Sequence, residues 1–592
     1  MPVLPFTIDH MILKIKPDFE SKILPDCEEI LQITAKNEVN ELEFDIAEMK
    51  IEKVISSNVP INNTKKKKDD NTMELQFDTK DDKLIIKLAK ELHHGDSIYI
   101  TIMYSAGYQY INDRLVIAKP RSGFHFIEYN EFHRKTNFQA WTQGESVESK
   151  YWFPCIDQPQ VKYPRELEVI IPENFVVISN GKEKSKNAAA NVEAEKKGTG
   201  HNNKLITHIW EEQTPLSTYL TSVVIGVFGQ EEQEYNRHAD KKIQLLYYWP
   251  ADFNKEDAML NFQNTPKMIK FFEEYIKTDY PYNKYAQVAV EDFEFGGMEN
   301  ASCTTLTRDI LFDKKASLDY TSEDVISYEL AHQWFGDLVT CKDWPHIWLN
   351  EGFATYFEAL YWEYSRGRDE FQYYIIQNLL DSYLNEASTL YKRPIVTKVY
   401  KHPDELFDTH SYQKGGCVLH MLRDYIGDDH FREGLRKYLD IYKTKTAETD
   451  DLQKFLEAVS GKNLGEFFDQ WVYTAGHPVL DIEFSKDHSN NVKLKITQTQ
   501  EGKVFQFDLE IFLIYFSTTS IAADGSRESS KEKKLHENIK ISGKETEKSF
   551  KIPVDDKGQI AEINRFSIDP QFKVLKEITS IKAPEEILIS EL

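Results

Sequence analysis

Cysteine is scarce in this chain of 592 residues. No two of the five cysteines have the spacing of a CxxC motif, so the sequence indicates neither a disulfide framework nor a thiolate zinc site. This usage is typical of a reducing, cytoplasmic setting, in which cysteines serve as small buried side chains. The five are Cys27, Cys155, Cys303, Cys341 and Cys417.

Long apolar runs are also missing, since no stretch reaches the roughly 18 residues of a membrane span. The N-terminus, MPVLPFTIDHMILKIKPDFE, lacks the basic and then apolar order of a signal peptide. Positive charge is in short supply: 72 Lys and Arg face 97 Asp and Glu, for a net charge of −25. Because non-specific nucleic-acid binding needs a basic surface, we expect neither nucleic acid nor membrane as a partner.

Apolar and aromatic residues, in contrast, are plentiful, at 41% and 13% of the chain. That is enough for sizeable cores and excludes an intrinsically disordered chain. The length suggests several domains, at about 150 residues each. The oligomeric state is not indicated by any pattern in the sequence.

Hydrophobic periodicity divides the chain into β, mainly α and then β regions. Period-two alternation within residues 13–16 and 98–104 predicts strands in the first part. From about residue 254 to 475 the apolar spacing is helical, with Pro266 dividing the first helix. Alternation returns at 492–496 and 505–515. Three polar runs, at 63–71, 181–203 and 518–530, are typical of solvated loops.

The central clue is Tyr328-Glu329-Leu330-Ala331-His332. In the zinc-peptidase pattern H-E-x-x-H, two imidazoles lie one turn apart on a helix and the Glu acts as general base. Here Tyr328 occupies the place of the first His. Tyr-Glu-x-x-His alone carries little information, because His332 alone would more often be an ordinary helix residue.

Three further segments give this pattern its weight. Eighteen residues separate His332 from Glu351, which lies within WLNEGFATYFE, where a carboxylate is the usual third ligand of a two-His zinc site. Upstream, after an apolar stretch that we expect to be an edge strand, come Gly296 and Gly297, which let a substrate backbone approach, and an acidic residue that can pair with an amine. Downstream, Tyr412 supplies a phenol for a tetrahedral oxyanion.

Together these segments resemble the M1 family of zinc aminopeptidases, the gluzincins. GGMENA, ELAHQWFGDLVT, WLNEGFATYFE and YQKGG occur in the family's order. The segments 142–145 and 153–159 are similar to the family's TQ and FPCFDEP motifs. The resemblance extends to about residue 480, and the β-rich tail looks like the family's small β-sandwich domain.

The resemblance implies a role for each matching residue. His332 and Glu351 would hold one zinc ion per chain, and Glu329 would activate water as general base. Tyr412 would donate to the oxyanion. The substrate would be a peptide with a free N-terminus, bound by a further set of residues: Glu145, Gly296, Gly297, Met298 and Glu299.

Tyr328 leaves the metal and the activity open. A phenol has a reference pKa of about 10, so its ligation at neutral pH costs a deprotonation of roughly 4 kcal/mol before any attraction to the metal. Tyr328 could ligate as phenolate with reduced zinc affinity, or the site could be poor in metal. The chain could also be a weakly active or inactive homologue that binds peptides or acts as a scaffold. No pattern favours a third possibility, an epoxide hydrolase activity.

We therefore expect a multidomain α+β fold with three parts. These are an N-terminal β-saddle (1–228), a thermolysin-like, mainly α catalytic domain (229–475) and a C-terminal β-sandwich (476–592), without the long C-terminal helical domain of larger family members. The expected activity is that of a cytoplasmic, zinc-dependent aminopeptidase that releases N-terminal residues from peptides. The side chain that it prefers at the first substrate residue is not indicated by the sequence.

Overall fold

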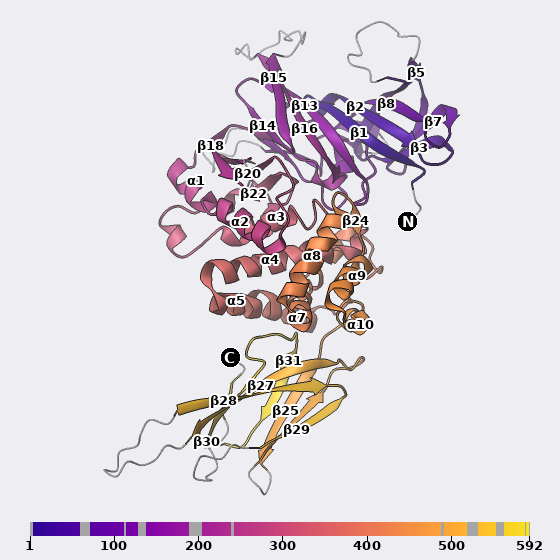
Figure 1. Ribbon diagram of the computed structural model, residues 1–592. Coiled ribbons are helices and arrows are strands. Elements are labelled where there is room, and N and C mark those ends of the chain that lie inside the picture. Colours follow the sequence, from indigo (N-terminus) through magenta and orange to yellow (C-terminus); the bar gives the residue numbers. More distant parts are fainter. Residues whose placement is uncertain are drawn as a thin grey trace, which may run out of the picture. The chain divides into compact units, whose positions relative to one another are not determined.

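Strands dominate both ends of the chain, and helices dominate its middle, which confirms the predicted fold class (Figure 1). The computed structural model describes residues 4–59, 72–111, 114–127, 138–188, 204–237, 242–486, 491–517, 531–551, 562–585 and 588–590. The predicted loops 63–71 and 518–530 lie outside these residues. The chain forms two compact units: Met1–Trp344 with Arg436–Glu448, and Pro345–Leu435 with Thr449–Leu592.

The largest sheet of the first unit has eight strands in the order β15-β16-β13-β1-β2-β8-β4-β5. The alternation predicted from the sequence is confirmed: Leu13 and Ile15 on β1 and Ile100 on β8 are buried, as one face of a strand should be. The strands are β1 (Phe6–Ile15), β2 (Leu24–Ala35), β4 (Met49–Ser57), β5 (Thr72–Glu74), β8 (Ser97–Ala106), β13 (Lys162–Pro172), β15 (Lys182–Ala188) and β16 (Leu205–Ser217).

The polar run at 181–203 is only partly described, and the part that is described is not a loop. Residues Lys182–Ala188 form β15, which pairs antiparallel with β16. An edge strand has one side open to water and tolerates charged side chains, which protect it against pairing with other chains. The polar composition of residues 182–188 therefore led to the wrong prediction of a loop. Residues 189–203 lie outside the described part.

Smaller sheets complete the N-terminal region. Their orders are β3-β7-β6, β11-β12-β17-β14 and β10-β9. The strands are β3 (Val39–Asp45), β6 (Gln76–Lys80), β7 (Lys83–Leu92), β9 (Tyr108–Ile111), β10 (Arg114–Ile117), β11 (Phe124–Ile127), β12 (Gln139–Thr142), β14 (Val176–Ser179) and β17 (Val223–Gly226).

A five-stranded sheet, in the order β18-β19-β20-β22-β21, supports the candidate site. The apolar stretch before residue 295 is β20 (Lys284–Val290), which we expected to be an edge strand. It lies instead between β19 (Lys242–Pro250) and β22 (Cys303–Thr307), parallel to both and buried throughout, and such strands have continuous apolar sequences. The sheet begins with β18 (Phe228–Asn236) and ends with β21 (Gly297–Met298), so the edge strand is the glycine motif itself.

Two helices of the first unit lie between β19 and β20 in the sequence, and a third follows β22. Pro266 lies in the first turn of α2 (Thr265–Ile276), directly after α1 (Lys255–Phe262), so it divides the helical stretch as predicted. Then comes α3 (Glu323–His332). The short strands β23 (Thr340–Cys341) and β24 (Thr446–Ala447) pair in parallel.

The second unit contains the remaining helices and the C-terminal strands. Its longest helix, α4 (Trp348–Arg366), is buried over its first fifteen residues. The others are α5 (Arg368–Tyr374), α6 (Asp381–Thr389), α7 (Gly415–Ile426), α9 (Thr449–Ser460) and α10 (Gly465–Trp471), while α8 (Asp428–Tyr442) ends in the first unit. None of the helices in the described part of the chain has the length and apolar character that crossing a lipid bilayer requires.

After Gly476, all the regular elements that the structure describes are strands, which are yellow in Figure 1. Two four-stranded sheets, β29-β26-β25-β31 and β28-β27-β30-β32, pack through one apolar core, which confirms the predicted sandwich. The strands are β25 (Val479–Lys486), β26 (Val492–Gln498), β27 (Phe507–Ser517), β28 (Lys531–Ile541), β29 (Glu545–Phe550), β30 (Glu562–Ile568), β31 (Glu577–Lys582) and β32 (Leu588–Ser590).

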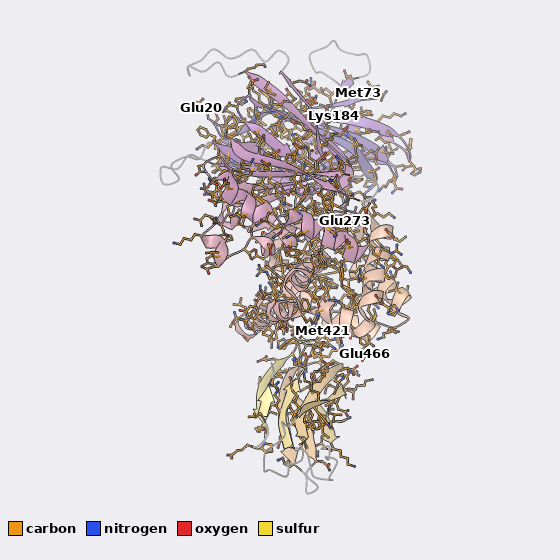
Figure 2. The ribbon with its side chains drawn as sticks, turned by 60° about the vertical axis from the view of Figure 1, so that its left-hand side comes forward. Glu20, Met73, Lys184, Glu273, Met421 and Glu466 are labelled. Atoms are coloured by element: carbon orange, nitrogen blue, oxygen red, sulfur yellow. The ribbon has the colours of Figure 1, made fainter. Side chains whose placement is uncertain are left out.

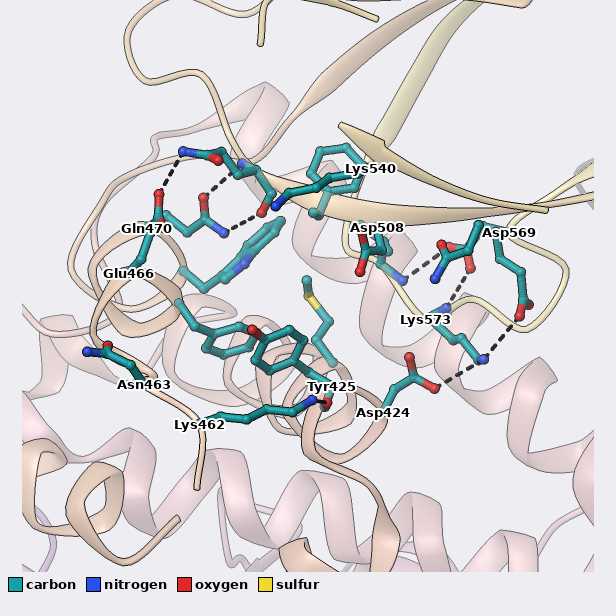
Figure 3. Close-up of a pocket in the computed structure, with 18 residues that line it drawn as sticks. Asp424, Tyr425, Lys462, Asn463, Glu466, Gln470, Asp508, Lys540, Asp569 and Lys573 are labelled. Carbon is teal, nitrogen blue, oxygen red and sulfur yellow. Dashed lines mark hydrogen bonds and ion pairs between the residues drawn. The ribbon is translucent and has the colours of Figure 1, made fainter. Parts of the chain in front are cut away.

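A cleft of about 420 Å³ lies where the sandwich meets α7 and α10. Met421 and Glu466 mark this junction in Figure 2. Lys573, which follows β30, pairs with Asp424 of α7 across the cleft at 3.1 Å and with Glu510 of β27 within the sandwich at 3.3 Å (Figure 3). These ion pairs connect the sheet to the helices.

Candidate active site

The predicted general base and zinc ligand lie on α3 in the first unit. Glu323 and Asp324 occupy its first turn, where acidic side chains interact favourably with the helix dipole. Towards its C-terminal end the helix is buried, and Glu329 and His332 are only 3% and 1% exposed. Charged groups are rarely this buried without a functional or structural partner.

The imidazole of His332 is oriented by the backbone. Its Nδ1 donates to the carbonyl oxygen of Phe335 at 2.9 Å. The ring proton is therefore on Nδ1, and Nε2 carries the lone pair, which is the arrangement of metal-binding histidines. The ring of Tyr328 lies one turn earlier on the same helix face, half-buried, with its centroid 4.8 Å from that of His332.

The glycine motif forms the two-residue edge strand β21. Gly297 and Met298 pair antiparallel with Leu306 and Thr305 of β22. The described strands include no neighbour on its other side, so this edge offers backbone groups to an extended peptide.

Gly297 lies directly against the predicted general base. A Cβ atom at this position would overlap the carboxylate of Glu329, at 2.6 Å from its Cδ and 2.7 Å from its Cγ. Gly296 has more room, since its nearest neighbour would be a Val325 methyl group at 3.7 Å. The first glycine therefore leaves the strand accessible, while the second makes space for Glu329.

Glu299 is held beside α3 by Gln333, a residue that the sequence reasoning missed. The amide nitrogen of Gln333 donates to the carbonyl oxygen of Glu299 at 2.8 Å, and its oxygen accepts from the Ser302 N–H at 2.7 Å. The Glu299 carboxylate lies 4.0 Å from His332 Nδ1 and is 4% exposed as a residue. In the sequence, this role of Gln333 was indicated only by its position next to His332.

Residues from the N-terminal sheets approach the same motif. Gln143, which follows β12, donates to the sulfur of Met298 at 3.3 Å. Glu145 is half-buried two residues later. The structure therefore brings the segment after β12 to the glycine motif.

Asp337 adds a buried carboxyl group near His332. Neither of its carboxylate oxygens has a hydrogen-bond partner within the described residues. Burial, followed by the nearby Glu299, raises the pKa of Asp337 well above its usual value, while His332 and Lys162 oppose this effect. The Lys162 ammonium donates to the carbonyl oxygen of Asp337 at 2.7 Å and so stabilises the turn after α3.

Glu351 and Tyr412 lie in the second unit. Glu351 is in the first turn of α4 and is 2% exposed. Tyr412 is half-buried on the π-helical turn His410–Lys414. Directly after the turn, α4 and α7 meet at two glycines, because a Cβ on Gly352 would lie 3.1 Å from the Cα of Gly415.

The sequence-predicted residues thus form two groups. Glu145, Gly296, Gly297, Met298, Glu299, Tyr328, Glu329 and His332 belong to the first unit, and Glu351 and Tyr412 to the second. In the first group a buried base, a buried imidazole and a buried carboxylate flank an open strand edge. This is chemistry suited to holding a peptide and moving a proton at its backbone.

Comparison with known proteins identifies the class. The profile of the Peptidase M1 N-terminal domain matches residues 8–220, and that of the Peptidase family M1 domain matches residues 260–471. Together they account for more than half of the chain, which therefore belongs to the M1 peptidase family.

Several curated relatives are aminopeptidases. Aminopeptidase A of Gloydius brevicauda is 32% identical over 68% of this chain and 40% of its own length. Human glutamyl aminopeptidase is 30% identical over 69% and 41%, and aminopeptidase 2 of Candida albicans is 28% identical over 84% and 50%. The chain thus spans half or less of the length of these relatives.

A solved structure shares the fold. The crystal structure of Legionella pneumophila aminopeptidase A in complex with aspartic acid superposes with a TM-score of 0.74, at 18% identity. The superposition covers 98% of this chain and 60% of the other. The β-rich, helical and β-rich parts therefore occur together in a solved aminopeptidase.

Proposed function

We propose that this chain is a zinc-dependent aminopeptidase that releases N-terminal residues from peptides. The observation that carries the proposal is the position of Glu329, whose carboxylate lies directly behind the open edge strand at Gly297. A peptide that extends this sheet would lie in front of the base. The domain boundaries in this proposal are 1–228, 229–475 and 476–592.

Zinc fits two of the three residues at the ligand positions of the motif. His332 has the protonation pattern of a metal ligand, and Glu351 is a buried carboxylate. Tyr328 is the departure, because phenols are not among the usual zinc ligands. We propose one zinc ion per chain, bound with lower affinity than a second histidine would give. When bound, zinc acts as a Lewis acid that polarises the substrate carbonyl.

The residues of the chain would share the remaining steps. Glu329 takes a proton from the attacking water and later passes it to the nitrogen of the leaving amine. The Tyr412 hydroxyl donates to the oxyanion that develops at the carbonyl. Glu299, helped by Glu145, pairs with the substrate's α-ammonium group.

This amine recognition explains why the activity would be confined to peptide N-termini. An internal stretch of peptide offers no positive charge, so it would gain no ion pair with Glu299 or Glu145. Gly296, Gly297 and Met298 would meanwhile bind the substrate backbone.

One specific observation favours a second function. Tyr328 stands where the motif requires a histidine, so a homologue that binds peptide N-termini without cleaving them is the alternative. A cytoplasmic location is also part of the proposal, and it is supported by the five cysteines, which are all buried and form no disulfide bond.

The test combines zinc analysis with hydrolysis of an aminoacyl-anilide panel. It uses the chain itself, Tyr328→His and, as a matched control, Tyr328→Phe, which removes only the hydroxyl group. Near-stoichiometric zinc with turnover in the chain, both reduced in Tyr328→Phe, would support the enzyme with Tyr328 as a ligand. Absent zinc and turnover, both gained in Tyr328→His, would overturn it and favour the peptide-binding homologue.

A further inference from the structure

A dense polar cluster in the second unit lies directly before Tyr412 in the chain. Glu386, Asp408 and His410 bring their ligand-type atoms within 4.8 Å of one another. His410 is fully buried, and the Asp408 side chain is 9% exposed. Three such groups resemble a metal site, but their hydrogen bonds show a different role.

The hydrogen bonds of His410 leave it no nitrogen lone pair for a metal ion. Its Nε2 accepts the backbone N–H of Arg393 at 3.2 Å. The ring proton is therefore on Nδ1, which faces Glu386 at 3.2 Å and Asp408 at 3.3 Å. A protonated nitrogen has no lone pair for a metal.

Asp408 is the centre of this cluster. Its Oδ2 accepts from the Tyr391 hydroxyl at 2.7 Å and from Arg393 Nε at 2.8 Å, and its Oδ1 accepts from Arg393 Nη2 at 2.5 Å. Burial opposes its ionisation, but hydrogen bonds from His410 and Arg393 outweigh burial and hold the pKa of Asp408 below its usual value. Asp408 is therefore a fixed anion with a bidentate partner.

The same residue starts the turn that carries Tyr412. The carbonyl oxygen of Asp408 accepts from the N–H groups of Ser411 and Tyr412, at 3.0 and 3.2 Å. Its Oδ1 also accepts from the N–H of His410 at 3.0 Å. Arg393 reaches the turn as well, since its Nη2 donates to Ser411 Oγ at 2.9 Å. Backbone and side chain of one aspartate thus fix the start of the turn.

We propose that Asp408, paired with Arg393, is a positioning residue that sets the place of the Tyr412 hydroxyl. It acts through the turn and does not touch the substrate. This inference rests on the role given to Tyr412 in the proposed function. A misplacement of about 1 Å in a catalytic group can cost on the order of a hundredfold in rate, so the arrangement has a measurable consequence.

The activity test is a double-mutant cycle with Asp408→Ala, Tyr412→Phe and the double variant, run in Tyr328→His if the chain itself has no turnover. We expect Asp408→Ala to lower kcat about ten- to a hundredfold with little change in KM. In the Tyr412→Phe background the same change should cost less than about twofold, because coupled residues are not additive. Asp408→Asn, which keeps an oxygen acceptor, should lose less.

Amide hydrogen exchange gives a second readout that needs no activity. Asp408→Ala should speed exchange at residues 410–414, whereas Asp428→Ala, which removes a partner of Arg423 elsewhere in the unit, should leave this segment unchanged.

Two results would overturn the inference: equal losses of kcat in both backgrounds, or unchanged kcat and unchanged exchange in Asp408→Ala. If Tyr412→Phe kept full activity, the role of Tyr412 in the proposed function would fail instead. The exchange experiment would then still report whether Asp408 fixes the turn.

Discussion

Replacing Gly297 by alanine should lower kcat by about two to four orders of magnitude while leaving the fold intact. The added Cβ would overlap the Glu329 carboxylate and lie 2.6 Å from its Cδ. The atoms in conflict are the end of a flexible side chain, so Glu329 would rotate away and the backbone pairing of β21 with β22 would persist. The melting temperature should therefore change by only a few degrees.

The size of the effect follows from the role of the base. General acid–base catalysis contributes about 10²- to 10⁴-fold, which corresponds to roughly 3 to 5 kcal/mol in the activation free energy. We expect Gly297→Ala to lose kcat in this range, measured on an aminoacyl anilide, with zinc content unchanged.

Gly296→Ala is the matched control, since its Cβ would meet nothing closer than 3.7 Å. We expect it to lose no more than about threefold, within the range of an ordinary contact change. Gly297→Ala with near-normal kcat would refute the reasoning, as would equal losses in the two variants.

Three further predictions concern stability and recognition. Gly352→Ala should lower the melting temperature, because its Cβ would lie 3.1 Å from Gly415 and 3.2 Å from the Ser411 carbonyl. Such overpacking costs about 1–3 kcal/mol in the free energy of unfolding. An unchanged midpoint in scanning fluorimetry would contradict this prediction. Burial lowers the pKa of Lys162 to about 7, so between pH 7 and 10 the unfolded state binds more protons than the folded state and the free energy of unfolding rises with pH. In Lys162→Met this rise should be smaller. Equal slopes of the free energy of unfolding against pH in the two proteins would contradict the prediction. Glu299→Gln should reduce the preference for free over N-acetylated peptides, measured as a ratio of kcat/KM, and an unaltered ratio would exclude Glu299 from amine binding.

Much of the architecture could be predicted because apolar periodicity follows burial closely. Leu13 and Ile15 alternate on a strand with one buried face, and Pro266 interrupts a helical pattern. The errors came from position within a sheet, which local sequence does not encode. Residues 182–188 are polar because they form an edge, and β20 is apolar because two parallel neighbours enclose it.

The candidate site was predictable in its residues more than in its contacts. The motifs predict helices at Glu329, His332 and Glu351, because the spacing of residues within a motif can be read directly from the sequence. The clamp from Gln333 to Glu299 and the contact of Gly297 with Glu329 depend on segments more than 30 residues apart. A single sequence has no signal for such contacts, because many side chains could fill the same space.

The two glycines at which α4 and α7 meet, next to the turn of Tyr412, also limit how this chain can evolve. A methyl group on Gly352 or on Gly415 would meet backbone rather than a mobile side chain. A change to alanine at either position is therefore destabilising on its own, whether or not a second change at the other position follows. A larger side chain at either position would require α4 and α7 to separate. We therefore expect sequence variation in this unit to occur at other positions.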